Sequence, residues 1–309
     1  MFTAGMRRES RMSCLVFDCG GTSVKYALAD REGELSGWGS IATPSSLELF
    51  LQSLDEIVEP VRKKGGLRGL AFSFPGEVHS EQGDIGGISA IPYIHGIPLK
   101  QMISSRYGGL PVSMENDANC ASLGELWKGV AAGHKEVIFV ICGTGIGGAA
   151  IEGGKLRKGI TGNRAEFGNY PMGGMEDGVL LTWSDHTLEK QARKYNRLTG
   201  EALHGRELFE RAESGDGQAK KLLDEFYHWM AVGCININFS FDPEFIAIGG
   251  GISSNRELIA GIQERIDRLL KGQRPGYLRP QIRACAHGNK ANLYGALYHF
   301  LNEERKDNR

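Results

Sequence analysis

Short apolar runs alternate with amphipathic stretches along this chain, and the alternation follows a similar order in both halves. In the first half, β-branched and aromatic runs predict strands at about 14–18, 24–29 and 34–43. A helix is expected to begin after Ser45 or Ser46 as its N-cap and to end near Lys64, because apolar residues recur there at helical spacing. The elements expected next are a buried strand at 69–74, a long loop at 76–98, a helix at 99–107 and a short strand at 111–114.

The second half repeats this plan. Strands are expected at 137–142, 147–152 and 245–248, and helices at about 180–197, 205–213, 217–239, 255–270 and 291–305. Strands followed by helices, twice over, predict the α/β fold class with two domains and a cleft between them. We assign residues 14–117 together with 291–309 to an N-terminal domain and residues 118–290 to a C-terminal domain. Residues 1–13 begin with a polar, basic stretch and are expected to form a disordered extension.

Composition and charge narrow the class of protein. The 309 residues carry a net charge of −1, which provides no electrostatic footprint for nucleic acid or for an anionic membrane surface. No uncharged apolar run approaches the ~20 residues that a membrane span needs. The six cysteines are scattered and do not resemble a disulfide framework, so the expected location is the reducing cytoplasm. Neither nucleic acid nor membrane is therefore expected as a partner.

Two glycine-rich turns carry the main chemical signal. The segments Asp18-Cys-Gly20-Gly21-Thr22-Ser-Val-Lys25 and Gly143-Thr144-Gly145-Ile-Gly147-Gly each lie between two apolar, β-branched runs. Glycine lets backbone N–H groups approach phosphate oxygens with no Cβ in the way. Two turns of the same form predict two related halves that face one nucleotide, although two unrelated hairpins could also contain them.

Three further segments are candidates, and each has a plainer interpretation. Asn116 and Asp117 end a short strand, where either residue could instead cap the helix that starts near Ala118. Glu166 follows a glycine-rich segment and could be an ordinary surface glutamate. The run 249–251 is three glycines at the end of a strand, which by itself indicates only a turn.

Taken together, the motifs resemble those of a known family. They are Asp18-x-Gly-Gly-Thr-x-x-Lys25, Phe74-Pro75-Gly76, Glu115-Asn116-Asp117-Ala-Asn119, Gly143-Thr-Gly-Ile-Gly147-Gly, Glu166-Phe-Gly168 and Ile248-Gly249-Gly-Gly251. In order and approximate spacing this set resembles the ROK (repressor, open reading frame, kinase) sugar kinases, a branch of the actin-like ATPase and hexokinase fold. The resemblance covers essentially residues 14–301 and implies two ribonuclease-H-like domains around a central cleft. It also implies phosphoryl transfer from ATP, with Mg²⁺, to a sugar hydroxyl, domain closure on the sugar, and by analogy a possible homodimer.

The resemblance also implies roles for individual residues. Asp117 is the expected general base, and Asp18 the aspartate associated with the Mg²⁺ of ATP. The residues expected to bind ATP and its phosphates are Asp18, Gly20, Gly21, Thr22, Lys25, Gly143, Thr144, Gly145, Gly147, Gly249, Gly250 and Gly251. The residues expected to bind the sugar are Gly76, Asn116, Asp117, Glu166 and Asn169.

The chain departs from the family at the end of the sugar site near C1. Zinc-containing members carry a histidine three residues after the glutamate and a cysteine cluster beyond it, whereas this chain has Asn169 and no cysteine in that segment. Zinc is therefore not expected, and His186 is expected to be a helix surface residue. Leu180 or Leu181 occupies the place of a second sugar-binding glutamate.

These departures bear on the substrate. The resemblance implies the 6-hydroxyl of a glucose-like sugar as the acceptor, because Asn116, Asp117 and Glu166 are retained. A site without polar contacts at C1 tolerates a substituent there, so a β-glucoside is also expected as a substrate. In this respect the chain resembles the zinc-free β-glucoside kinases of the family. Tyr93 and nearby isoleucines are expected to pack on an aglycone or second ring. The alternatives are a glucokinase or N-acetylhexosamine kinase that acts on the free sugar, and a non-catalytic sugar-sensing or regulatory protein.

Overall fold

The strand patterns of the two halves form two separate five-stranded sheets in the computed structural model, which describes residues 13–160, 164–272 and 279–307. The chain divides into a first unit, Met1–Trp127 with Lys290–Arg309, and a second unit, Lys128–Asn289. Ser13 opens the first strand, and the rest of the extension predicted at 1–13 lies outside the described residues. Each unit is described below by itself.

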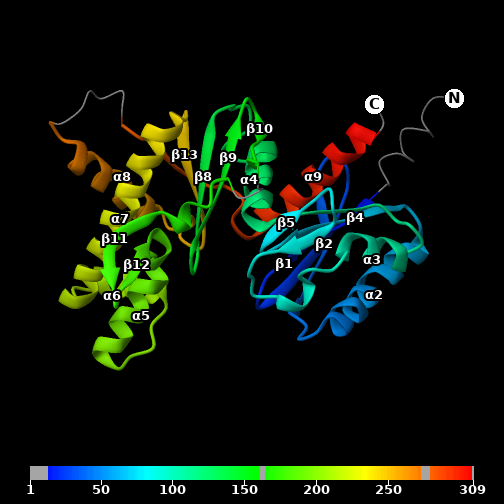
Figure 1. Ribbon diagram of the computed structural model, residues 1–309, viewed down its shortest axis with the longest axis horizontal. Coiled ribbons are helices and arrows are strands. Elements are labelled where there is room, and N and C mark those ends of the chain that lie inside the picture. The colour runs from blue at the N-terminus through cyan, green and yellow to red at the C-terminus, as the bar shows by residue number, and fades with distance from the viewer. Residues whose placement is uncertain (1–12, 161–163, 273–278, 308–309) are drawn as a thin grey trace. The chain divides into compact units, whose positions relative to one another are not determined.

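The first unit is built on a mixed sheet in the order β3-β2-β1-β4-β7. The antiparallel part comprises β1 (Ser13–Cys19), β2 (Ser23–Ala29) and β3 (Leu35–Ala42), and the parallel part adds β4 (Leu67–Phe74) and β7 (Val112–Asn116) to β1. Successive residues of β1 point to opposite faces. Leu15 and Phe17 pack with α2 (Leu47–Lys64) and α3 (Leu99–Arg106), whereas Cys14 and Val16 pack with α9 (Ala291–Asp307) (Figure 1).

Helix α4 (Asp117–Lys128) belongs to the first unit, although the sequence analysis assigned residues 118–290 to the second domain. Two glycines allow α4 to approach α9 closely. A Cβ on Gly124 would overlap the backbone carbonyl of Ala291, and a Cβ on Gly295 would overlap that of Cys120. The Trp127 ring stacks on Tyr298 at 5.5 Å between ring centroids. Because its partners lie in the last helix, α4 stays with the first unit.

The segment 76–98, expected to be a long loop, contains a hairpin and a short 3₁₀ helix. The hairpin pairs β5 (Glu77–His79) with β6 (Asp84–Gly86), and Pro92–Ile94 forms the 3₁₀ helix η1. Val78 and Ile85 face each other across the hairpin and are buried in the first unit's core. The hairpin is therefore anchored to the core through one face.

The second unit's sheet has the order β10-β9-β8-β13-β14. Its strands are β8 (Val137–Cys142), β9 (Ile146–Glu152), β10 (Lys155–Leu156), β13 (Phe245–Gly250) and β14 (Ile282–Ala284). Alternate residues of β8 and β13, among them Val140 and Ile248, join a large apolar core with the helices. These helices, α5 (Leu188–Thr199), α6 (Gly205–Glu213), α7 (Gly217–Phe241) and α8 (Arg256–Leu270), gather on one side of the sheet (Figure 1).

The helix predicted at 180–197 begins later, because a second hairpin precedes it. β11 (Pro171–Glu176) pairs with β12 (Val179–Thr182) through Asp177 and Gly178, whose φ angles are +50° and +79°. Asp-Gly with both φ angles positive is the preferred turn of a two-residue hairpin, so this signal was present in the sequence. A 3₁₀ helix η3 (Trp183–His186) then leads into α5. Its His186 is only 3% exposed, so the prediction of a surface histidine is wrong.

The remaining predicted helices and strands agree with the observed elements to within a few residues at each end. The shorter elements that the analysis did not name are β10, β14 and the 3₁₀ helices η2 (Phe167–Asn169) and η5 (Gly288–Lys290). Within the part of the chain that the structure describes, none of the helices combines the length and apolar character that a bilayer span requires.

Candidate active site

The first glycine turn connects β1 to β2 in the first unit. Its backbone is closed by a hydrogen bond from the Gly20 N–H to the Ser23 carbonyl at 3.0 Å, and the Thr43 hydroxyl donates to the Gly20 carbonyl. A Cβ on Gly21 would lie 2.5 Å from the Cβ of Ala90, so only glycine fits at this position. Gly21 and Thr22 are exposed. The turn thus presents backbone to solvent, which suits an approaching phosphate.

Asp18 lies at the end of β1, directly before this turn. It is opposite Lys25 in the β1–β2 register, and its Oδ2 lies 3.6 Å from the Lys25 Nζ. Its Oδ1 accepts a hydrogen bond from the Asn292 side-chain amide of α9 at 2.8 Å. Mg²⁺ in nucleotide sites is usually held by one or two carboxylates together with phosphate oxygens and water, so a single oriented aspartate fits this requirement.

Asn116 and Asp117 lie where β7 passes directly into α4. The Asn116 Oδ1 accepts hydrogen bonds from the N–H groups of Ala118 and Asn119 at 2.9 and 3.1 Å, so Asn116 caps the helix. Its Nδ2 donates to the Gly76 carbonyl at 3.0 Å. An amide nitrogen carries two hydrogens, and a second donor therefore remains for a ligand. The capping interpretation is correct for Asn116, and it is compatible with sugar binding by the same side chain.

Asp117 begins α4 and is partly exposed. Its Oδ1 accepts a hydrogen bond from the Ala118 N–H at 2.8 Å. A carboxylate in the first turn of a helix interacts favourably with the helix dipole, which holds the charge at this end of the helix. The side chain therefore has a defined position next to Asn116.

A buried carboxylate supports this junction from beneath. Glu115 is fully buried and accepts hydrogen bonds from the Asn116 N–H at 2.8 Å and from the Asn119 Nδ2 at 3.0 Å. Its other oxygen accepts from the Ser80 hydroxyl at 3.3 Å and lies 3.9 Å from the His299 Nδ1. Buried carboxylates need such partners. Glu115 thereby ties the strand end to the β5–β6 hairpin and to α9.

The second glycine turn connects β8 to β9 in the second unit. The Gly143 N–H donates to the Gly145 carbonyl at 2.9 Å, and the Ile146 N–H donates to the Ser184 hydroxyl at 3.0 Å. The Thr187 hydroxyl donates to the Thr144 carbonyl at 3.2 Å. Gly143 and Thr144 are exposed, as in the first turn. Both turns thus join antiparallel strands and leave backbone exposed, but they differ in length: four residues separate the paired Cys19 and Val24, and three separate the paired Cys142 and Ile146.

Glu166 and Asn169 lie beside this second turn. Glu166 directly precedes the 3₁₀ helix η2 and Asn169 is its last residue, and both are exposed. Two glycines allow the segment to approach the turn closely. A Cβ on Gly168 would overlap the Ile146 carbonyl, and one on Gly148 would overlap Phe167. The glutamate predicted for sugar binding is thus held close to the turn predicted for phosphate binding.

The third glycine run ends β13 and borders a hollow of about 660 Å³ within the second unit. Gly250 has a φ of +82°, and a Cβ there would overlap the Cys142 carbonyl, so the run is packed against the second turn. The hollow is lined by Gly143, Thr144 and Gly251 and by the first residues of α6 and α8. Its volume falls within the range of small-molecule sites. Of the ATP residues predicted in the second unit, Gly143, Thr144 and Gly251 therefore line one hollow.

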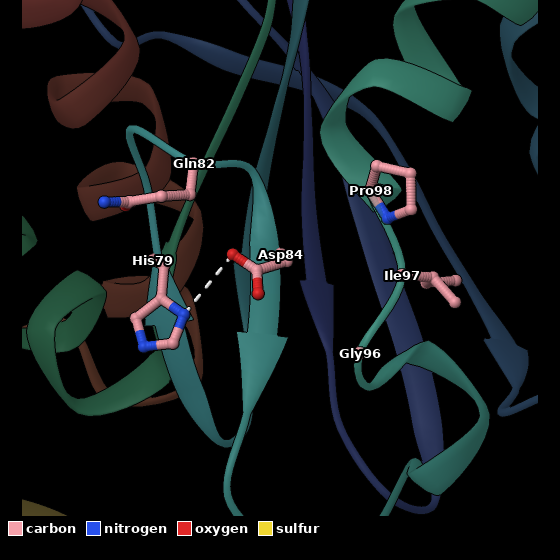
Figure 2. A pocket seen from close by; sticks show the side chains of 6 residues that line it. All are labelled: His79, Gln82, Asp84, Gly96, Ile97 and Pro98. Atoms are coloured by element: carbon pink, nitrogen blue, oxygen red, sulfur yellow. Dashed lines mark hydrogen bonds and ion pairs between the residues drawn. The ribbon is translucent and has the colours of Figure 1, made fainter.

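A second hollow of about 560 Å³ lies on the β5–β6 hairpin of the first unit. Figure 2 shows His79 and Asp84 pointing toward each other from the two strands, with 3.3 Å between Nδ1 and Oδ1. Gln82 and the segment 96–98 complete the lining. No role of this hairpin was predicted from the sequence.

The expected wall for an aglycone is only partly present. Ile91 and Ile94 are 1% and 0% exposed and belong to the first unit's core, so they do not face a ligand. The ring of Tyr93 packs on Phe50 at 6.4 Å between centroids, and burial raises the pKa of its hydroxyl to about 12. Ile88, which is 97% exposed, and the half-buried Ile97 are the isoleucines of this segment that reach solvent.

Three further residues of the candidate site were not predicted from the sequence. Asn292 fixes Asp18 from 274 positions away, and Ser184 completes the second turn from 38 positions away. No local pattern links such distant partners. His95 lies near Gly76, with its Nε2 3.5 Å from where a Cβ of that glycine would be. A histidine in a glycine-rich loop was the one available signal for it.

A protein-only metal site needs several ligating side chains close together. Among the described residues, no three His, Cys, Asp or Glu side chains gather as a metal site would require. All six cysteines lie in the described ranges, and no disulfide links them.

Comparisons with known proteins agree with this geometry. The model of the ROK family matches residues 14–303. A β-glucoside kinase from Listeria monocytogenes is 32% identical over 305 residues, covering 96% of this chain and 99% of the relative. The crystal structure of a ROK family protein from Streptococcus pneumoniae TIGR4 in complex with sucrose has a TM-score of 0.87 and 34% identity, covering 96% of this chain and 100% of that one. A ROK family glucokinase from Streptomyces griseus, in complex with glucose and AMPPNP, has a TM-score of 0.75 and 29% identity, covering 92% and 98%.

These similarities and the two α/β sheets place the protein in the class of actin-like ATPase and hexokinase folds, as predicted. Within that class, the chain belongs to the ROK family. The predicted resemblance to β-glucoside kinases is confirmed, and the predicted enzyme class agrees with the kinases named among its relatives.

Proposed function

We propose that this protein is an ATP-dependent sugar kinase that phosphorylates the 6-hydroxyl of a glucose-like sugar or β-glucoside. The observation that carries the proposal is the β7–α4 junction, where the Asp117 carboxylate begins a helix beside Asn116. Asn116 is fixed through Gly76, and the junction rests on buried Glu115. Phosphoryl transfer relies on positioning and charge stabilisation, and this junction supplies positioning.

In the proposed reaction the sugar O6 attacks the γ-phosphorus of ATP, and the bond from that phosphorus to the ADP oxygen breaks. Asp117 accepts the proton that leaves the hydroxyl. Asn116 orients the sugar through its second amide hydrogen, since its first is bound to Gly76. Glu166 of the second unit offers a carboxylate that can accept from two vicinal hydroxyls.

For the nucleotide, we propose that the first turn, with Gly20, Gly21 and Thr22, and the second turn, with Gly143 and Thr144, bind the phosphates. The hollow of about 660 Å³ beside the second turn and the third glycine run suits the nucleoside. Mg²⁺ bound with ATP would neutralise charge on the phosphates, and Asp18 is the carboxylate that we propose to associate with this ion. Asn292 and Lys25 hold this carboxylate in position.

The preference for a β-glucoside rests on the C1 end of the proposed sugar site. Asn169 is exposed at the position where zinc-containing members carry a histidine, and Leu180, in the following hairpin, is 50% exposed. A site without a fixed polar partner for the C1 hydroxyl has little means to reject a substituent there. The β-glucoside kinase from L. monocytogenes is similar over nearly its whole length, which supports the same choice.

The test is a comparison of kcat/KM for cellobiose, methyl β-glucoside, glucose, N-acetylglucosamine and N-acetylmannosamine, with ATP consumption as the readout and NMR to locate the phosphate. We expect β-glucosides to be used at least as well as glucose, with phosphate on O6. Free sugars preferred a hundredfold or more would replace the β-glucoside assignment by a free-sugar kinase. No ATP consumption with any sugar would overturn the kinase itself.

A further inference from the structure

The hydroxyl of Ser89 has its hydrogen-bonding capacity nearly filled by its own loop in the first unit. It lies 2.7 Å from the His95 Nε2, and it accepts a hydrogen bond from the Ile91 N–H at 3.2 Å. The other ring nitrogen of His95, Nδ1, lies 3.0 Å from the Gly87 carbonyl oxygen. Three hydrogen bonds thus connect four positions of one short segment.

The direction of these bonds follows from the chemistry of the groups. A carbonyl oxygen only accepts, so the His95 Nδ1 carries the hydrogen that it donates to Gly87. In the neutral imidazole the Nε2 is then a lone-pair acceptor, and the Ser89 hydroxyl must donate its single hydrogen to it. One lone pair of the Ser89 Oγ is used by Ile91. The hydroxyl therefore has one lone pair left and can only accept from a ligand.

The location of Ser89 is set by its neighbours. Ala90, the next residue, is packed against Gly21 of the first turn. The His95 ring lies next to Gly76, whose carbonyl accepts the Asn116 amide. Ser89 is therefore placed between the turn proposed for phosphate and the residues proposed for the sugar, all within one unit. It is part-buried beside the exposed Ile88, so a ligand can reach it.

We propose that Ser89 is a specificity-determining residue that accepts a hydrogen bond from one ring hydroxyl of the sugar, and that His95 is a positioning residue that fixes this acceptor polarity. The proposal rests on the proposed sugar kinase function. The substrate must then carry a free hydroxyl at that ring position. Replacement of this hydroxyl by hydrogen, fluorine or an ether oxygen removes the donor, so Ser89 loses the hydrogen bond that it would accept from the sugar.

Deoxyfluoro sugars test the polarity, because fluorine is close to a hydroxyl in size but cannot donate. We would measure the Kd of glucose and of its 2-, 3- and 4-deoxyfluoro analogues by calorimetry without ATP, and their kcat/KM with ATP. For the wild-type protein, affinity and kcat/KM should fall about tenfold or more when fluorine replaces the hydroxyl that donates to Ser89. In Ser89→Ala that loss should shrink to about threefold or less, while the losses at the other positions persist. Ser105→Ala, an exposed serine on α3, is the matched control and should behave as wild type.

His95 is tested by two substitutions. His95→Phe frees the Ser89 hydrogen, so this variant should discriminate less between hydroxyl and fluorine at the same position and should raise KM with less than a threefold change in kcat. His95→Gln retains an acceptor and should restore most of the discrimination, which a merely structural role would not predict.

The outcomes separate the two proposals. Unchanged discrimination at every position in Ser89→Ala would overturn the role of Ser89 even if the protein is an active kinase. Sugar binding with the expected pattern, but without phosphoryl transfer, would support Ser89 and overturn the kinase. Absence of binding by all four sugars and by methyl β-glucoside would overturn both.

Discussion

At the scale of single residues, the site depends on side chains that serve the fold and the proposed chemistry together. Asn116 caps α4 with its oxygen and holds Gly76 with its nitrogen. The N-cap bonds alone are worth about 1 kcal/mol in a typical helix. Asp117 follows in the chain and shares the Ala118 N–H. The proposed general base is therefore positioned by the bonds that start the helix.

Asp117→Asn tests the proposed base. The amide oxygen can still accept from the Ala118 N–H, so the fold and the binding of sugar and ATP should be retained. A general base typically contributes ~10²–10⁴-fold to the rate, and kcat should fall by that order. Steady-state kinetics and calorimetric binding would be measured together. Glu56→Gln, which alters an exposed carboxylate on α2, should leave both unchanged. A variant with more than about a tenth of the wild-type kcat would contradict the assigned role.

At the scale of elements, close helix packing decides which parts of the chain belong together. Helices α4 and α9 touch through Gly124 and Gly295, and the sheet lies beneath α9. The Asp117 junction and the Asp18 partner Asn292 thus lie at the starts of two helices that contact each other. A change at this crossing is expected to affect stability and site geometry together.

Gly295→Ala tests this crossing. The added Cβ would overlap the Cys120 carbonyl, which is backbone and cannot move aside cheaply. Overpacking of this kind costs about 1–3 kcal/mol or more, and the midpoint of chemical denaturation should fall accordingly. Gly217→Ala is the matched control, since nothing lies within 4 Å of its Cβ position at the start of α7. That control should be neutral or stabilised by up to about 1 kcal/mol. Equal stability of the two variants would contradict the proposed contact.

His186 provides an element-scale prediction about pH. Burial is the largest influence and lowers its pKa, and the Lys194 ammonium lowers it further, whereas the Met172 carbonyl and the Glu225 carboxylate oppose the shift. An unfolded histidine titrates near 6.5, so the unfolded chain takes up this proton first as the pH falls. The contribution of His186 to stability is therefore present above about pH 6.5 and is lost as the pH falls through the lower folded-state pKa.

His186→Phe removes the titration and the hydrogen bond to the Met172 carbonyl, which is 3.2 Å from Nε2. At pH 7.5 the variant should be less stable by about 1 kcal/mol. The difference in the free energy of unfolding should narrow or reverse toward pH 5, because only the wild type is destabilised by the cost of a buried charged histidine. Urea denaturation across this range measures it. A constant difference at every pH would show that His186 does not titrate on unfolding.

At the scale of the whole molecule, apolar packing anchors the segment that follows Glu166. Met172 and Trp183 are buried in the second unit's core, and the His186 ring stacks on Trp229 at 4.7 Å between centroids. The β11–β12 hairpin between them is thus held at both ends by apolar contacts. A structural zinc site would need four nitrogen or sulfur ligands in this neighbourhood.

Metal analysis of the purified protein tests this arrangement. We expect no stoichiometric zinc, and incubation with EDTA should leave Tm unchanged in the absence of nucleotide. Kinase activity should be lost in EDTA and return with Mg²⁺, because Mg²⁺ acts with ATP. One zinc ion per chain that resists dialysis, or a Tm lowered by the chelator, would refute a fold held by packing alone.

Much of the fold was predictable because its signals are local. The period of apolar residues in α2 and the β-branched runs of β1 and β8 appear within short windows, and the glycines of both turns stand next to the strands they connect. The Asp177-Gly178 hairpin was local too and could have been found. Motif spacing identified the family and placed Asp18, Asp117 and the two turns in the candidate site.

Only the tertiary structure decided the remaining contacts. Asn292 meets Asp18 because α9 packs on β1, and α4 stays with the first unit because two glycines far apart in the chain meet. The burial of His186 and the direction of the Ser89 hydrogen bond likewise depend on neighbours that no period or motif encodes. Short-range patterns reveal how a segment is shaped and which face it buries. They carry no information about which distant segment covers that face, since many apolar partners would satisfy the same pattern.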